Sequence, residues 1–468
     1  MKLKSTLILL AVFAGLLGFV LIFESRSKAR QTAKDNAAKL VDLAAADVER
    51  IELNAGVETI SFKKDDKGEW LITAPVEAAA EASEVNRLAE DLSNLKFDRL
   101  VEEEAADPAK YEIPKKVITL WYKGRTEPVK VLIGMENPID NSLFAMREGE
   151  KRVVLLSSYL KSGFDKTTLD FRQKDVFKFE PEDVVSVRLR FKDVSWEALK
   201  KDGVWRLEKP VAALADKSRI EDVLRLLSGL KAKEFVSEKK LETEVAGFGL
   251  ADPEYTVSLS LPARSQDVTF AIHKQDDKYY ATTSLSTKII IADAVSLVEL
   301  EKKPDEMREK SVAVFNSWDA QKLRLTKGAL DLTVAKDAEG SWRFEDAGKA
   351  EADRSKVESL IRRVESLEAA EFIDSPAGLG EYGLDQPQAE IGIWTKQDDK
   401  DTEVRVLIGA EDAVRKQVVV RNPDLNYLFR VDSSFLADLP KQAKDWQPAP
   451  PEEKKPEEDK GSAEGGKR

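Results

Sequence analysis

Side chains able to perform catalysis are sparse in this 468-residue chain. It contains a single histidine, His273, and no cysteine, which excludes thiol nucleophiles, zinc–thiolate sites and disulfides. A Ser-His-Asp arrangement is formally possible, but no Gly-x-Ser-x-Gly motif supports it. His273 stands just past a predicted strand, at a place where two related segments have glycine. We therefore interpret it as an exposed turn residue.

Two further motifs resemble pieces of active sites. Glu102-Glu103-Glu104 could supply the pair of carboxylates used in glycoside hydrolysis, but the corresponding Ser237-Glu238-Lys239 and Asp374-Ser375-Pro376 repeat no such pair. A solvated acidic loop is the simpler interpretation. Gly461 to Lys467 resembles the start of a phosphate-binding loop, yet it lacks the serine or threonine and the preceding strand. We predict no enzymatic activity, no cofactor, and no catalytic, cofactor-binding or metal-binding residue.

The most regular aromatic feature is a glycine, any one residue, and then a tryptophan. It occurs three times, ending at Trp70, Trp205 and Trp342, with spacings of 205 − 70 = 135 and 342 − 205 = 137 residues. Exposed rings could stack on sugars, whereas buried rings would pack a hairpin against the following helix. Because each tryptophan keeps its register with that helix, we favour packing.

An amphipathic helix is expected after each tryptophan. Four apolar residues recur at i, i+3, i+7 and i+10, which places them on one face of a helix: Val85, Leu88, Leu92 and Leu95; Ile220, Val223, Leu227 and Leu230; Val357, Leu360, Val364 and Leu367. Residues suited to cap the first turn stand upstream: Ser83, Ser218 and Ser355, or Glu81, Asp216 and Asp353. One more apolar anchor follows each stripe: Leu100, Phe235 and Phe372.

Strand patterns surround each helix in the same order. Each repeat opens at an aspartate, Asp47, Asp183 or Asp319, and both 183 − 47 and 319 − 183 equal 136. Alternating apolar residues then predict a half-buried strand: Ile60 and Phe62, Trp196 and Ala198, Leu332 and Val334. After the helix come an aromatic-x-aliphatic loop and a strand over 117–122, 255–261 or 389–395. This order predicts an α+β fold of three tandem repeats with mainly antiparallel sheets.

Charge and hydropathy describe the environment of the chain. The net charge of −12 argues against a general nucleic-acid binder. Thr6 to Phe23 is an uncharged stretch of 23 − 6 + 1 = 18 residues, about 27 Å long as a helix and able to span a bilayer core. No small-x-small cleavage site follows, so we predict a signal-anchor, not a cleaved signal peptide. Because large domains translocate with little regard to charge, we expect residues 24–468 outside the cytoplasm.

These patterns divide the chain into six parts. We predict a short tail and transmembrane anchor over residues 1–23, a stalk over 24–46, and repeats over 47–181, 182–316 and 317–446. Residues 447–468 are rich in proline, glutamate and lysine, and we expect this tail to be disordered.

Several of these motifs together resemble a known family. The anchor, Asp-Val-x-x-Ile at Asp47, the glycine–tryptophan hairpins, the helix stripes, Tyr-Gly-Leu at Tyr382 and Leu-Ile-Gly at Leu407 resemble the bacterial domain of unknown function 4340 (DUF4340), in three copies from Asp47 to Trp446. The resemblance implies a single-pass inner-membrane protein with most of its chain in the periplasm. By analogy of family alone, it also implies a protein partner such as an ABC-type permease or a gliding-type auxiliary subunit. The family has no established catalytic residues.

Two functions follow as hypotheses. The first is a non-enzymatic envelope protein that acts as a scaffold or accessory subunit of an ABC-type, gliding-type transport system. The alternative is a cell-wall or polysaccharide binding module, which would need Trp70, Trp205 and Trp342 to be accessible to sugars. An enzyme would need a polar pocket with perturbed carboxylates, which no motif in the sequence indicates.

Overall fold

The structure of the protein is a computed structural model that describes residues 38–54, 56, 58–294, 296–346, 349–397 and 400–448. Within these residues no helix is both long and apolar enough to cross a membrane. The predicted anchor at residues 6–23 lies outside the described residues, as does the tail from residue 449 onward. The anchor and the disorder of the tail therefore stay predictions.

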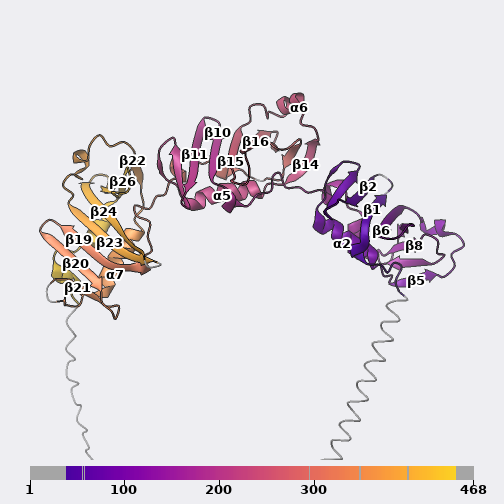
Figure 1. The fold of residues 1–468 in the computed structure, drawn as a ribbon, viewed down its shortest axis with the longest axis horizontal. Helices are drawn as coiled ribbons and strands as arrows, with labels where there is room; N and C mark the ends of the chain where they lie inside the picture. Colours follow the sequence, from indigo (N-terminus) through magenta and orange to yellow (C-terminus); the bar gives the residue numbers. More distant parts are fainter. Residues whose placement is uncertain are drawn as a thin grey trace, which may run out of the picture. The chain divides into compact units, whose positions relative to one another are not determined.

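The named strands of the described chain form three sheets (Figure 1). The first comprises β1 (Val48–Asn54), β2 (Thr59–Lys64), β3 (Trp70–Ala74), β4 (Ala78–Ala79), β5 (Arg99–Glu102), β6 (Lys116–Tyr122), β7 (Val129–Glu136), β8 (Leu143–Arg147) and β9 (Val153–Leu156). The second comprises β10 (Ser186–Phe191), β11 (Val194–Lys201), β12 (Val204–Lys209), β13 (Ala213–Leu214), β14 (Ala232–Ser237), β15 (Tyr255–Ser260), β16 (Val268–Gln275), β17 (Lys278–Thr283) and β18 (Ile289–Ala292). The third comprises β19 (Ala320–Lys327), β20 (Leu330–Lys336), β21 (Trp342–Phe344), β22 (Glu371–Ile373), β23 (Ala389–Gln397), β24 (Lys400–Asp412), β25 (Gln417–Arg421) and β26 (Leu428–Asp432).

Each sheet carries one longer helix, and we call a sheet with its helix a repeat. These helices are α2 (Ala82–Ser93), α5 (Lys217–Ser228) and α7 (Arg354–Glu365). The other helices are short: α3 (Lys161–Phe164), α4 (Thr168–Phe171), α6 (Glu242–Gly247), η1 (Ala45–Asp47), η2 (Pro108–Tyr111), η3 (Ser158–Leu160), η4 (Pro181–Asp183), η5 (Val298–Glu301), η6 (Pro304–Met307), η7 (Ser317–Asp319), η9 (Gly380–Tyr382), η10 (Ser433–Asp438) and η11 (Ala443–Trp446). The α+β class is confirmed.

The three sheets share one topology. The first runs β4-β3-β2-β1-β6-β7-β8-β9-β5, and the second repeats this order strand for strand. The third runs β21-β20-β19-β23-β24-β25-β26-β22. The described strand pairs are antiparallel, as in β1 with β2 and β6. Since the helix follows a strand at one edge and precedes the strand at the opposite edge, it must cross one face of the sheet.

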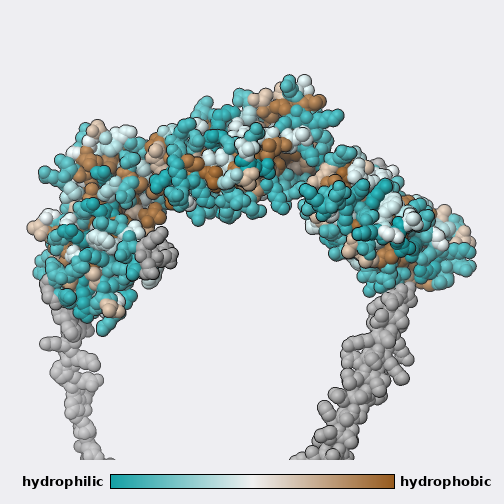
Figure 2. Space-filling view, viewed as in Figure 1, coloured by the Kyte–Doolittle hydropathy of each residue, from teal (hydrophilic) through white to brown (hydrophobic). Residues whose placement is uncertain are grey.

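The chain forms two compact units. Among the described residues, one unit contains those up to Asp175 together with Ala232–Glu234, and the other contains Val176–Lys231 and those from Phe235 onward. The first sheet belongs to the first unit. The second unit holds the third sheet and nearly all of the second. Figure 2 shows that hydrophilic residues cover much of the visible surface of both units, as the charged fraction of 34% leads one to expect.

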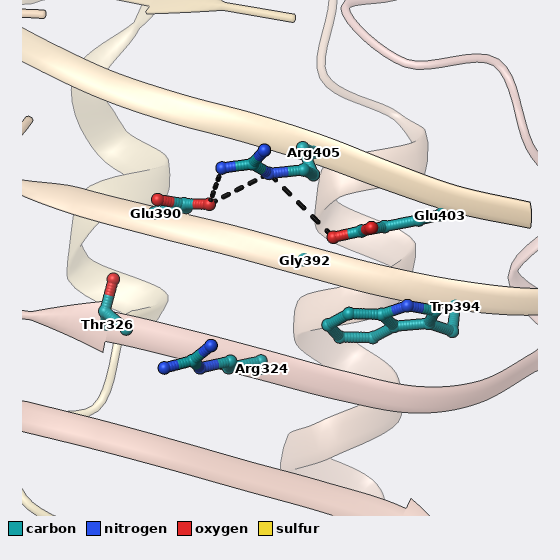
Figure 3. Close-up of a pocket in the computed structure, with 7 residues that line it drawn as sticks. All are labelled: Arg324, Thr326, Glu390, Gly392, Trp394, Glu403 and Arg405. Carbon is teal, nitrogen blue, oxygen red and sulfur yellow. Dashed lines mark hydrogen bonds and ion pairs between the residues drawn. The ribbon is translucent and has the colours of Figure 1, made fainter. Parts of the chain in front are cut away.

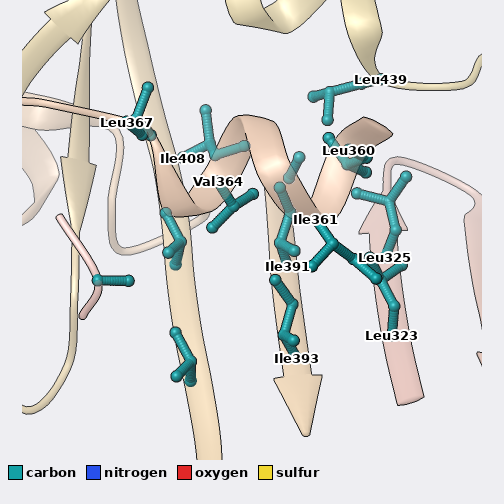
Figure 4. Packing of buried hydrophobic residues seen from close by; sticks show 14 of the residues in the cluster. Leu323, Leu325, Leu360, Ile361, Val364, Leu367, Ile391, Ile393, Ile408 and Leu439 are labelled. Carbon is teal, nitrogen blue, oxygen red and sulfur yellow. The ribbon is translucent and has the colours of Figure 1, made fainter. Parts of the chain in front are cut away.

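The helix stripes form the centre of each core. All twelve predicted stripe residues are at most 5% exposed. In the third repeat the first three lie on α7 and Leu367 follows its end, two residues past Glu365. All four pack in the core with alternate residues of β19, β23 and β24 (Figure 4). The predicted strand residues are equally buried, with Phe62 and Val334 fully covered. Because a helix period of 3.6 and a strand period of two select these same residues, the local pattern alone determines which faces meet.

The acidic residues, not the serines, begin the helices. The N-caps are Glu81, Asp216 and Asp353. The Asp216 carboxylate accepts hydrogen bonds from the backbone N–H groups of Ser218 and Arg219, at 2.8 and 3.2 Å. A carboxylate here satisfies free N–H groups of the first turn and also suits the helix dipole.

The anchor predicted after each stripe is only partly confirmed. Phe372 packs against the third core, but Leu100 is 40% exposed. Leu100 lies in β5 and Phe372 in β22, and each is the last strand at the edge of its sheet. The pairing of β5 with β9 is irregular between Leu100 and Glu102, whereas that of β22 with β26 is regular. The equivalence between Leu100 and Phe372 in sequence therefore does not extend to burial.

The first core begins before Asp47. Leu40 and Val41 are each 1% exposed and pack in the first core. The N–H of Leu40 donates to the carbonyl of Leu95 at 2.8 Å, so this segment lies against the end of α2. Residues 38–46, predicted as part of a stalk, thus contribute packed residues to the first repeat.

The aromatic-x-aliphatic loop rests directly on the strand that carries Leu-Ile-Gly. A Cβ atom added to Gly134 would lie 2.2 Å from the carbonyl oxygen of Tyr111, and one added to Gly409 would lie 2.1 Å from that of Tyr382. No real side chain tolerates such distances. The glycine is therefore required because the loop backbone occupies the space of a side chain.

We predict that Gly409→Ala destabilises the third repeat by about 1–3 kcal/mol, because the new methyl group displaces the docked loop. Gly378→Ala is the matched control, since a Cβ atom there meets nothing within 4 Å. Urea unfolding of both variants measures the difference. Equal stability of the two variants would contradict the docking explanation.

Candidate functional site

The three glycine–tryptophan hairpins serve packing. Gly68, Gly203 and Gly340 have φ angles of +83°, +80° and +81°, in the left-handed region that favours glycine. The tryptophans that follow, Trp70, Trp205 and Trp342, are only 4%, 3% and 1% exposed. They provide no accessible surface for sugar stacking, and the form of the polysaccharide hypothesis that relied on them is wrong.

The helix of the repeat and a lysine side chain hold the hairpin tryptophans in place. The Trp70 Nε1 donates to Asn86 of α2 at 2.8 Å, and the Trp342 Nε1 faces Glu358 of α7 at 3.5 Å. The Lys336 ammonium lies 5.1 Å from the Trp342 ring centroid. These contacts satisfy the polar edge of each ring and hold the hairpin against the helix.

His273 is not a turn residue. It lies inside β16, pairs with Tyr280 of β17 and is half-buried. A Cβ atom added to Gly249 would lie 2.3 Å from the His273 ring, so the imidazole packs on the backbone of the loop. The second repeat has exchanged the strand glycine for a histidine and accommodates its ring over the loop glycine, Gly249.

The other sequence candidates do not converge on a site. Glu102 accepts hydrogen bonds from Tyr111, at 2.7 Å, and from Lys110. The Lys110 and Tyr111 bonds hold the pKa of Glu102 below its usual value, the opposite of what a general acid needs. No group of three His, Asp or Glu residues able to hold a metal occurs in the described part of the chain. The glycine-rich motif at residues 461–467 lies outside it.

A hollow occurs on the open face of the third sheet, opposite α7. It encloses about 180 Å³ and is lined by Arg324, Thr326, Glu390, Gly392, Trp394, Glu403 and Arg405 (Figure 3). Its floor is a row across three strands, in which Gly392 of β23 pairs with Arg324 of β19 and with Arg405 of β24. Trp394 follows two residues along the same strand and therefore faces the same side.

The charged groups around this hollow are paired. Arg324 donates to both oxygens of Asp331, at 3.0 and 2.7 Å, and this bond lowers the pKa of Asp331. Arg405 donates through Nε and Nη2 to Glu390, at 3.0 and 2.5 Å. Glu403 lies 3.8 Å from Arg405. The hollow thus presents guanidinium donors and carboxylate acceptors in balance.

The second sheet also has a hollow, which is lined by residues of β10, β11, β12 and β15. It encloses about 270 Å³, and its lining includes Arg188, Arg190, Thr256 and Ser258. In register, Arg188 pairs with Ser258, as Arg324 pairs with Gly392. Sequence reasoning missed both hollows because their residues come from strands far apart in the chain. The one available signal was a glycine, Gly392, in the middle of an alternating strand.

Comparison with known families identifies the repeats. The sequence model of the domain of unknown function DUF4340 matches residues 70–203, 205–377 and 342–449, and each match begins on the tryptophan of a glycine–tryptophan hairpin. The chain belongs to the DUF4340 family. The resemblance inferred from the motifs, including its tandem copies, is confirmed. No curated protein matches this DUF4340 chain.

Solved structures with some likeness are DNA polymerase sliding clamps. One from Pseudomonas aeruginosa, with ligand, is 10% identical, with 85% of this chain and 94% of the clamp covered and a TM-score of 0.15. Another, from Bartonella birtlesii LL-WM9, is 9% identical, with 83% and 92% covered and a TM-score of 0.14. Superpositions of this quality support no inference about the fold or function of the DUF4340 chain.

We predict that Asp337→Asn weakens the hairpin of Trp342 at neutral pH. The Asp337 carboxylate accepts from Arg343 at 2.6 Å and from the Ser341 N–H at 2.9 Å, and these bonds lower its pKa. A lowered pKa stabilises the fold above the unfolded value of about 3.9, and this contribution disappears as the pH falls through the folded value.

The stability difference between the wild type and Asp337→Asn, measured by urea unfolding, should therefore be present at pH 7 and shrink below about pH 4. Glu339→Gln, in the same turn, is the control and leaves these bonds in place. A difference that stays constant down to pH 2.5 would contradict the electrostatic explanation.

Proposed function

We propose that this DUF4340 protein is a non-enzymatic, membrane-anchored protein of the bacterial envelope. Its three α+β repeats act as a periplasmic scaffold or accessory subunit for a transport system of ABC type. The observation that carries the proposal is the way in which the second and third repeats are joined, because a scaffold must hold its binding surfaces in fixed positions.

The connection between the second and third repeats is a paired segment, not a free linker. The Met307 carbonyl accepts from the Asp216 N–H at 2.9 Å, and the Glu309 N–H donates to the Leu214 carbonyl at 3.0 Å. Three residues later, the Val312 N–H donates to the Leu367 carbonyl at 2.9 Å. The same short segment is therefore bonded to the second repeat and to the end of α7 in the third.

A buried arginine strengthens this connection. Arg308 is 1% exposed, and its guanidinium carbon lies 3.7 Å from the Phe372 ring centroid and 4.7 Å from that of Tyr427. Its Nη2 lies 2.7 Å from Asp374. The planar guanidinium stacks on both rings while its charge is balanced, an arrangement that lysine does not reproduce. Tyr427 also accepts the Leu214 N–H, at 3.3 Å.

The rival functions have weaker support. An enzyme would require a pocket with convergent, perturbed acid and base groups, and the candidates from the sequence do not converge. A polysaccharide-binding module loses Trp70, Trp205 and Trp342 as contacts, since all three are buried.

We predict that Asp374→Ala destabilises the second unit by about 3 kcal/mol, because it leaves the Arg308 charge buried without its nearest carboxylate. Asp305→Ala is a matched control, since Asp305 lies 3.6 Å from Arg308 but its side chain is 78% exposed. The control should cost less than about 1 kcal/mol. Chemical denaturation of the full chain measures both, and equal losses would refute a buried ion pair at this joint.

The scaffold role is tested by crosslinking the full-length protein in native membranes and identifying the attached proteins by mass spectrometry. Permease or auxiliary subunits of one transport system should be enriched over a control protein that carries only the N-terminal anchor. A full-length protein that crosslinks to nothing and purifies as a monomer in mild detergent would overturn the proposal.

A further inference from the structure

The hollow of the third sheet departs from the pattern of the other repeats. The row Arg324, Gly392 and Arg405 corresponds to Glu52, Thr119 and Lys130 in the first sheet and to Arg188, Ser258 and Thr269 in the second. Of the three rows, only the third has a glycine at its central position. Its loss of a side chain opens the space beside Trp394.

Gly392 is buried, and a glycine inside a strand carries a cost in stability. It destabilises a strand by roughly 0.5–1 kcal/mol relative to alanine, and it often marks a place where a ligand or another backbone approaches closely. Gly392 pairs in regular register with both neighbours, so it serves no bulge. Its backbone has no positive φ angle that would require glycine.

Because Gly392 has no side chain, the Trp394 indole can lie close to the backbone of β23. A Cβ atom on residue 392 would stand 3.1 Å from Cη2 and 3.3 Å from Cζ3 of Trp394. The indole remains partly exposed, unlike the three hairpin tryptophans. The Lys322 ammonium lies 5.3 Å from the Trp394 ring centroid. The equivalent Trp121 of the first sheet likewise has the Arg50 guanidinium 4.1 Å from its ring centroid.

The polar rim around the indole suits hydroxyl groups. The lining includes two guanidinium groups and two carboxylates, so it has no excess charge to attract a polyanion. Arg324 uses two of its five N–H donors in its bonds to Asp331, and Arg405 uses two in its bonds to Glu390. A sugar hydroxyl both donates and accepts, so it can use a remaining N–H and a carboxylate oxygen together.

We propose that this hollow binds a neutral saccharide, with one sugar ring against Trp394 and its hydroxyls on Arg324, Arg405, Glu390 and Glu403. The apolar C–H face of a sugar ring supplies the surface that packs on an aromatic ring, while the hydrogen bonds fix its orientation. This site goes beyond the scaffold role and does not depend on it, since the joint at Arg308 and the hollow use different residues.

The test measures binding of full-length protein in detergent to a panel of neutral tetrasaccharides of glucose, N-acetylglucosamine, mannose and galactose, by isothermal titration calorimetry. We expect at least one to bind. Trp394→Ala should weaken that binding at least tenfold. Trp318→Ala is the matched control, because Trp318 is 78% exposed elsewhere on the third repeat, and it should bind as the wild type does.

Gly392→Ser separates binding from stability. Serine is the residue at the equivalent Ser258 of the second sheet, and its Cβ would press on the indole and fill the hollow. We expect a tenfold or greater loss of binding in a variant that still unfolds cooperatively in urea.

Absence of binding to every panel member, unchanged binding by Trp394→Ala, or preferential binding of an acidic polysaccharide or a peptide would each overturn the proposal. The variants also keep the two proposals apart. Crosslinks to transport subunits that persist in Trp394→Ala leave the scaffold role intact, whatever the result with sugars.

Discussion

The fold of every repeat depends on the burial of one helix face against one sheet face. Each helix starts after an edge strand and ends before the opposite edge strand, so its stripe must lie across the strands between them. The stripe residues are almost fully covered, as Leu92, Leu227 and Val357 illustrate. Removing that contact would expose the apolar side of the whole sheet, at about 25 cal/mol for each Å² uncovered.

That constraint explains why the opposite face of the sheet is free to vary. The face covered by the helix is apolar in all three repeats. On the opposite face, the aromatic-x-aliphatic loop packs on apolar residues such as Leu155 and Val419, and the rest carries ion pairs such as Arg324 with Asp331 and Arg188 with Asp267. Exposed ion pairs contribute little to stability, so their replacement is tolerated. The difference between Thr119, Ser258 and Gly392 lies on this face, where a change affects recognition more than folding.

Features that depend on nearby residues could be predicted from the sequence, whereas features that depend on strand register could not. Helix stripes, the glycine turns before the tryptophans and the strand alternation are set by neighbours within about a dozen residues, and all were predictable. His273 was misplaced because β16 continues through it into a tight turn at Asp276 and Asp277. The hollow was missed because Arg324 and Gly392 are 392 − 324 = 68 residues apart, and only strand pairing brings them together.

The C-terminal end of the third repeat differs from those of the first two in one backbone hydrogen bond. In the first two repeats the N–H of Gln173 donates to Ala79 and that of Glu309 to Leu214. In the third repeat, the Trp446 carbonyl accepts from the Asp353 N–H, just as the Met307 carbonyl accepts from the Asp216 N–H in the second. Pro448 thus stands at the place that corresponds to Glu309. Proline has no backbone N–H group to donate. Pro448 therefore cannot form the bond that Gln173 and Glu309 form at the corresponding place in the first two repeats.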